Sequence, residues 1–105
     1  MKVLKKVIIT FVLILMPSVS LAEQLSTPKT VKRIFTEGSS AAGFYTVEGI
    51  SECKWGIMYL DLSIEAGKGM LSQVLTAKSA GFKVVRVDYI VSSNGICQAS
   101  GLHIE

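Results

Sequence analysis

The chain has 105 residues, with eleven basic and eight acidic side chains that give a formal charge of +3. Three of the lysines lie within the first six residues, so the remaining chain holds eight basic and eight acidic residues and is formally neutral. Its longest basic cluster is the pair Lys32-Arg33, too little positive charge for the footprint of a nucleic-acid-binding protein. Composition therefore excludes nucleic acid as a partner.

The N-terminal segment has the features of a secretory signal peptide. Three lysines precede an apolar run over residues 7–16, and Pro17 ends that run. Ser20 and Ala22 are small residues at the third and first positions before a cleavage site. The run has ten residues, whereas crossing a bilayer takes roughly 20. We therefore expect residues 1–22 to be removed between Ala22 and Glu23, leaving a periplasmic or secreted protein that is not inserted in the membrane.

The 83 residues after this cut are enough for one domain. Residues 23–29 are polar and predict a short N-terminal arm, followed by a single domain over residues 30–105. Alternating β-branched and aromatic residues predict a first strand over 30–36. The composition of 37–43 predicts a loop, and residues 44–50 predict a second strand with a bulge at Gly49.

A third strand is predicted over residues 57–63, with one apolar face formed by Met58, Leu60 and Leu62. The hydrophobic period then changes from two residues to that of a helix, over residues 65–80. Two glycines weaken its first turn, so the regular helix is expected to begin near Lys68, and Gly81 suits a left-handed C-terminal cap. The apolar stripe of this helix is expected to consist of Met70, Leu71, Val74, Leu75 and Ala77.

The last two predicted strands form a hairpin. Residues 82–91 alternate strictly and place Val85, Val87, Tyr89 and Val91 on one face. Asn94 and Gly95 favour a tight reversal. Residues 96–105 return as a fifth strand, which we expect to bend at Gly101.

The order β-β-β-α-β-β predicts a mainly β domain with one helix, arranged as a small OB-fold-like barrel. The alternative for the same order is an open α+β antiparallel sheet with the helix packed on one face.

The two cysteines, Cys53 and Cys97, are predicted to form a disulfide, because the chain is directed to an oxidising compartment. Closing a loop of about 45 residues would contribute roughly 4 kcal/mol in the chain-entropy model. Two cysteines with only His103 nearby in sequence make a poor metal-ligand set, so no metal is expected.

The C-terminal half, with the runs MLSQVLTAKSAGFKVVRVDYIV and NGICQASGLHIE, resembles the helix and last two strands of the OB-fold B subunits of secreted bacterial toxins. These are subunits of the cholera and subtilase-cytotoxin kind. The chain also resembles small uncharacterised exported proteobacterial proteins with one cysteine before the third strand and one before the last. The resemblance implies a five-copy ring that binds cell-surface glycans. In cholera-type subunits the first cysteine lies near the mature N-terminus, unlike Cys53, so no glycan-binding residue is carried over.

Residues that could support catalysis have simpler interpretations. His103 is the only histidine and lies on a strand face opposite the apolar residues. Asp61 and Glu65 could form a carboxylate pair of the kind that glycosidases use, but their position favours capping of the helix. Residues 66–70 lack the spacing of a phosphate-binding loop. We expect no enzymatic activity and no cofactor.

The candidate ligand or partner surface consists of Trp55, Lys54 and Tyr59. A lone tryptophan in a connecting segment can stack on a sugar or insert into a partner, or it can cover the disulfide or close the mouth of the barrel. Tyr45 would flank the same surface in one strand register. The sequence therefore predicts a non-enzymatic binding or assembly protein, glycan- or receptor-binding in the manner of toxin B subunits. The alternative is a periplasmic interaction or inhibitor module. The partner is an unknown protein, a glycan, or further copies of the chain.

Overall fold

The computed structural model describes residues 21–105, so most of the predicted signal peptide lies outside the described part of the chain. The described residues are mainly β with one α-helix, as the sequence predicted, with one strand more than expected. The elements are β1 (Leu21–Leu25), β2 (Val31–Glu37), β3 (Ala41–Thr46), the 3-10 turn η1 (Lys54–Gly56), β4 (Ile57–Asp61), α2 (Glu65–Ala80), β5 (Val84–Val91) and β6 (Cys97–Ile104). Within residues 21–105, no helix has the length and apolarity that a membrane crossing requires.

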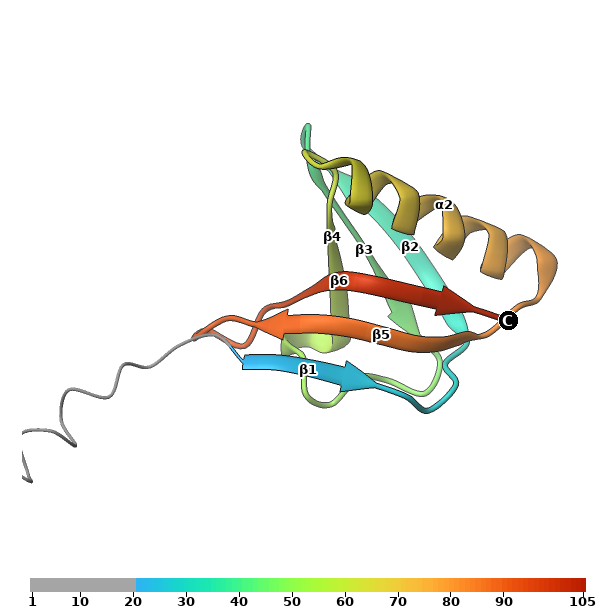
Figure 1. The fold of residues 1–105 in the computed structure, drawn as a ribbon, viewed down its shortest axis with the longest axis horizontal. Coiled ribbons are helices and arrows are strands. Elements are labelled where there is room, and N and C mark those ends of the chain that lie inside the picture. The colour runs from blue at the N-terminus through green and yellow to red at the C-terminus, as the bar shows by residue number, and fades with distance from the viewer. Residues whose placement is uncertain (1–20) are drawn as a thin grey trace, which may run out of the picture.

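The six strands form one mixed sheet in the order β1-β5-β6-β4-β3-β2. All neighbours are antiparallel except β4 and β6, which run parallel. The sheet turns sharply along this order, so that β5 and β6 cross in front of β2, β3 and β4, with β1 beside β5 (Figure 1). The order ends at β1 and β2, and the sheet is not closed.

Strand β1 occupies the start of the segment that was expected to be a polar arm. It pairs antiparallel with β5, and both residues of the predicted cleavage site take part, Ala22 opposite Ile90 and Glu23 opposite Tyr89. The edge of β5 supplies backbone partners, and Leu25 is buried in the core, which together hold this polar sequence in an extended conformation. Reciprocal backbone hydrogen bonds of 2.8 and 2.9 Å between Lys29 and Val84 continue the pairing.

The hairpin of β2 and β3 is tighter than the predicted one. Residues 41–43 were expected in a loop, but they are the first half of β3, while the predicted strand 44–50 ends at Thr46. The small residues there pair as a strand because neighbours supply the packing, and Ala42 is fully buried. Gly49 is not a bulge but lies in the following loop with φ +80°. The third predicted strand likewise ends early, at Asp61.

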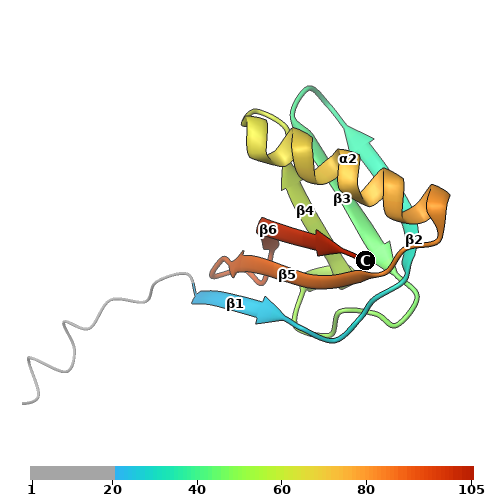
Figure 2. The ribbon, with the colours of Figure 1, turned by 45° about the vertical axis from the view of Figure 1, so that its right-hand side comes forward.

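Helix α2 packs on the inner face of the sheet, against β6, β4, β2 and β3 (Figure 2). It buries Gly67, Met70, Val74 and Ala77, whereas Leu71 is only partly buried and Leu75 is exposed. The predicted stripe was therefore too wide, because the buried residues already follow the three- and four-residue spacing of a single helix face. The helix begins at Glu65 rather than near Lys68. The left-handed cap at Gly81 is confirmed, with φ 78° and its N–H donating to the Ala77 carbonyl.

Strands β5 and β6 depart from simple alternation at two points. An irregularity between Val84 and Arg86 leaves Val84 fully buried and Val85 only half-buried, so the row of core residues begins one position earlier than predicted. A second irregularity lies between Asp88 and Tyr89, opposite Gly101, where the sequence predicted a bend.

The predicted disulfide is confirmed. Cys53 and Cys97 are both buried, and their Cα atoms lie 5.4 Å apart. The bridge ties the segment just before β4 to the start of β6, and therefore holds the turn that carries Trp55 against the β5–β6 hairpin.

Candidate binding face on the outer side of the sheet

The sheet has an outer face, the one that α2 does not cover. Directly paired residues share a face, so the register fixes one continuous row across five strands. From β2 to β5 this row consists of Phe35, Gly43, Tyr59, Gln98 and Ile90. It is an outer row, because the alternate positions on β3, β4 and β6 are core residues.

Three rings gather on this face, and we call Phe35, Tyr45 and Tyr59 the aromatic patch. The ring centroid of Phe35 lies 5.9 Å from that of Tyr45 and 5.8 Å, edge to face, from that of Tyr59. The guanidinium of Arg33 lies 4.6 Å from the centre of the Tyr45 ring. All three rings are half-buried, so each keeps part of its surface open to solvent.

Gly43 is what allows the patch to assemble. A Cβ atom there would lie 2.7 Å from the Phe35 ring and 2.9 Å from the Met58 carbonyl oxygen. The Phe35 ring therefore occupies the space that any other side chain at this position would fill.

Two hollows continue the face beyond the patch, toward β6 and β5. One has a volume of about 330 Å³ and is lined by Ser40, Ala41, Tyr59, Leu60, Asp61, Ile96 and Gln98. The other, about 180 Å³, is lined by Ile90, Ser92, Ile96 and Gln98. The two hollows share Ile96 and Gln98. The outer face therefore runs from the aromatic rings on β2, β3 and β4, past the polar Gln98 on β6, to the exposed apolar Ile90 on β5.

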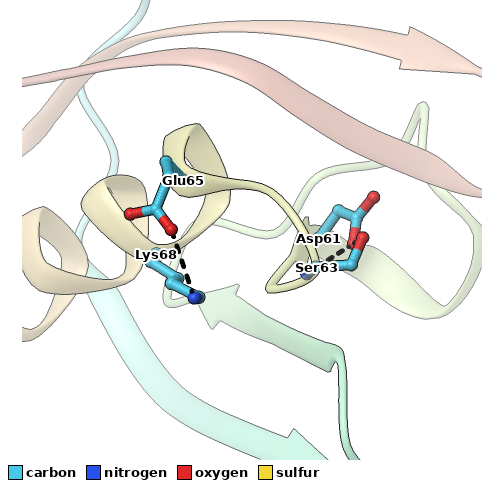
Figure 3. Close-up of polar contacts among 4 residues, drawn as sticks. All are labelled: Asp61, Ser63, Glu65 and Lys68. Carbon is cyan, nitrogen blue, oxygen red and sulfur yellow. Dashed lines mark hydrogen bonds and ion pairs between the residues drawn. The ribbon is translucent and has the colours of Figure 1, made fainter.

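The two carboxylates that could have formed a catalytic pair are engaged separately (Figure 3). Asp61 accepts the Ser63 N–H at 2.9 Å and the Ser63 hydroxyl at 2.5 Å. These hydrogen bonds lower the pKa of the Asp61 carboxyl, and the bond from the Ser63 hydroxyl has the larger effect. Glu65 lies in the first turn of α2, where a carboxylate favours the helix dipole, and pairs with Lys68 at 3.3 Å. Asp61 does not cap the helix, whose N-cap residue is Ile64.

Trp55 lies in a turn that the Gly56 N–H closes by donating to the Cys53 carbonyl at 3.0 Å. Its backbone has φ 60°, a left-handed conformation that bulky residues rarely adopt. The side chain is 64% exposed, so the indole does not fill the core. The Lys54 ammonium lies 4.7 Å from the centre of the indole ring, and the Lys54 N–H donates to the Gly95 carbonyl at 2.8 Å.

The predicted surface of Lys54, Trp55 and Tyr59 thus divides in two. Lys54 and Trp55 belong to the turn, whereas Tyr59 belongs to the aromatic patch, with Tyr45 as its neighbour on the same face. The sequence interpretation missed Phe35 and Arg33. The alternation within residues 30–36, which places both on one strand face, would have found them.

His103 and the residues around it form an exposed polar cluster at the other end of the outer face. His103 lies opposite Arg86, which pairs with Asp88 at 3.2 Å. The Gln24 amide donates to Asp88 at 3.0 Å, and this bond together with Arg86 lowers the pKa of Asp88. Residues 21–105 hold no group of three His, Cys, Asp or Glu side chains placed to bind a metal ion.

No family model, no curated protein and no solved structure matches this chain.

Proposed function

We propose that this protein is an exported, non-enzymatic binding module whose ligand lies on the outer face of the sheet. The observation that carries the proposal is the aromatic patch with Arg33 stacked on Tyr45. Mutually packed rings on a solvent-facing sheet surface supply large contact area with little conformational entropy to lose, which is typical of binding sites. The separate engagement of Asp61 and Glu65 supports binding rather than hydrolysis.

The proposed location is the periplasm or the extracellular space. The Cys53–Cys97 disulfide is compatible with an oxidising compartment, and the sequence of residues 1–22 is typical of a signal peptide. A glycan or a glycosylated receptor is the proposed ligand class, in the manner of the toxin B subunits that the C-terminal half resembles. Assembly into a ring of identical copies belongs to the same proposal.

The test is a glycan array probed with the exported protein and with two variants, alongside native mass spectrometry for the number of copies. Tyr45→Ala removes the ring of the patch on which Arg33 stacks and should reduce glycan binding by about tenfold, as expected for loss of one aromatic contact and its cation–π partner. Phe82→Ala is the matched control, because Phe82 is an exposed aromatic residue at the far end of α2. Equal binding by wild type and Tyr45→Ala would contradict the proposal.

A second candidate function is a periplasmic interaction or inhibitor module that acts on another protein. The exposure of Trp55 favours it, since a strained backbone that presents a solvent-facing indole is typical of functional sites. Pull-down from periplasmic extract should then recover one stoichiometric protein with the wild type and lose it with Trp55→Ala. If wild type and Trp55→Ala both bind a glycan, and neither recovers a protein from the extract, this candidate is contradicted.

A further inference from the structure

We infer that the 330 Å³ hollow beside Tyr59 is a subsite for one uncharged sugar ring. This inference rests on the proposed function, because it assigns a ligand class to the outer face that the proposed function treats as the binding surface. It also excludes acidic sugars, which the proposed function does not.

The hollow exists because β4 and β6 stay together over a short stretch only. Their parallel pairing consists of Met58 with Cys97 and Tyr59 with Gln98. Beyond these pairs Asp61 is paired with Ala41 of β3 alone, so the side chains of Tyr59, Asp61 and Gln98 border a space with no strand across it. Its volume is at the lower end of the roughly 300–1,000 Å³ of ligand pockets, which suits a small ring ligand.

The lining combines the groups that a sugar ring needs. Tyr59 is half-buried and held from one side by Phe35, which leaves a ring surface against which the C–H groups of a sugar can pack. Gln98 is exposed on β6 and carries both a donor and an acceptor. Both bonds from Ser63 go to Oδ1 of Asp61, and the second carboxylate oxygen points away from Ser63 (Figure 3). That oxygen can accept a hydroxyl of the ligand.

Charge decides which sugars fit. Asp61 is the one charged side chain that lines the hollow, and no lysine or arginine lines it. The hydrogen bonds from Ser63 lower the pKa of Asp61, so the carboxylate stays ionised at neutral pH. A carboxylate on the ligand would face this negative charge without a cation to offset it, and so a neutral ring is favoured over a sialic or uronic acid.

The experiment is saturation-transfer NMR and chemical-shift titration of the exported protein with four probes. Methyl β-galactopyranoside and methyl α-mannopyranoside are neutral, whereas N-acetylneuraminic acid and galacturonic acid are acidic. At least one neutral probe should bind and both acidic probes should bind more weakly. Gln98→Ala and Tyr59→Ala should each weaken binding of that probe by about tenfold, the loss of one good polar or stacking contact. Tyr59→Phe should retain it.

Two matched controls separate the subsite from general effects on the fold. Gln73→Ala changes a glutamine on α2, and Glu65→Gln neutralises the carboxylate next along the chain; neither residue lines the hollow, and neither should change binding. Asp61→Asn keeps an acceptor for Ser63 and should narrow the difference between neutral and acidic probes. Because Gln98 is exposed, its variant folds even where Tyr59→Ala does not.

Three results would overturn the subsite. They are tighter binding of an acidic probe, absence of binding by every probe, and unchanged binding of the neutral probe by Gln98→Ala. Each leaves the proposed function standing if Tyr45→Ala still reduces binding on the glycan array. Loss of the Tyr45 effect with a Gln98 effect retained would instead contradict the role of the aromatic patch, since the ligand would still lie on the outer face but without the Tyr45 ring.

Discussion

At the scale of single residues, two glycines in the same helix meet opposite surroundings. A Cβ atom on Gly67 would lie 1.7 Å from the Asp61 carbonyl oxygen, whereas a Cβ atom on Gly69 has no heavy atom within 4 Å. Gly67 therefore lets the first turn of α2 rest on the end of β4, at the residue that lines the hollow. Gly69 has no such role and only lowers the helix propensity.

We predict that Gly67→Ala destabilises the protein by about 1–3 kcal/mol, because the helix must shift away from rigid backbone. Gly69→Ala should instead stabilise it by about 0.5–1 kcal/mol, the ordinary gain of alanine over glycine in a helix. Urea unfolding with the disulfide intact measures both. Equal effects of the two substitutions would show that the close approach at Gly67 is unimportant.

At the scale of elements, strongly periodic segments could be predicted and context-dependent ones could not. The existence of β4, α2, β5 and β6 followed from alternation or helical spacing in the sequence. Strand β3 begins at Ala41-Ala42-Gly43, residues of low strand propensity whose packing comes from distant neighbours, with Ala42 buried and the Phe35 ring over Gly43. No local pattern contains that information. The aromatic patch has the same origin, since it needs the register of three strands, whereas each ring alone is an ordinary strand residue.

The disulfide joins two elements, and its removal should be costly. Replacing Cys53 and Cys97 together by alanine is predicted to destabilise the protein by up to about 4 kcal/mol, since a loop of about 45 residues is then free in the unfolded chain. The free energy of unfolding in guanidinium, compared between the oxidised wild type and the double variant, measures the loss. A difference below about 1 kcal/mol would show that the elements hold together without the bridge.

The loop after β3 is held by a carboxylate whose protonation should matter in acid. Glu48 accepts the Thr30 N–H and hydroxyl, each at 2.7 Å, and Lys83 donates to the Thr30 hydroxyl at 2.6 Å. These hydrogen bonds lower the pKa of Glu48 from 4.5 to about 2. The bond from the Thr30 N–H contributes most to this shift, and the bond from the Thr30 hydroxyl contributes next. A folded-state pKa below the unfolded one means that the ionised carboxylate stabilises the fold.

This contribution is complete above about pH 4.5 and is lost as the pH falls toward about 2. Glu48→Gln should therefore lower stability at neutral pH by less than about 1 kcal/mol, because the group is exposed, and should flatten the acid limb of the stability curve. Glu37→Gln, at the exposed end of β2, is the matched control. Thermal unfolding between pH 7 and pH 2 would refute the prediction if both variants followed the same curve.

At the scale of the whole molecule, fold class was predictable and sheet order was not. The mixture of strands and one helix follows from the hydrophobic periods along the chain. The parallel contact of β4 with β6 joins segments separated by a helix and a strand, and no local pattern specifies it. The exposure of Trp55 is equally non-local, because it depends on where the disulfide and the Gly95 contact hold the turn.

Strand β1 should also change with processing. A cut between Ala22 and Glu23 would remove Leu21 and Ala22, the partners of Val91 and Ile90. We predict faster amide hydrogen exchange in the Ile90–Val91 segment of a chain that begins at Glu23 than of one that begins at Leu21. Exchange at Val87, opposite the retained Leu25, is the internal control. Equal exchange of the 90–91 segment in both chains would show that the first pairs of β1 do not hold the edge.

Under the proposed cleavage, the same strand would link maturation to association between molecules. The proposed cut lies within β1, so its position decides how much of the β5 backbone is left without a hydrogen-bonding partner. Bare strand edges recruit extended segments from other chains. The position of the proposed cut would then set the tendency of the molecule to pair with other copies, without any change in its core.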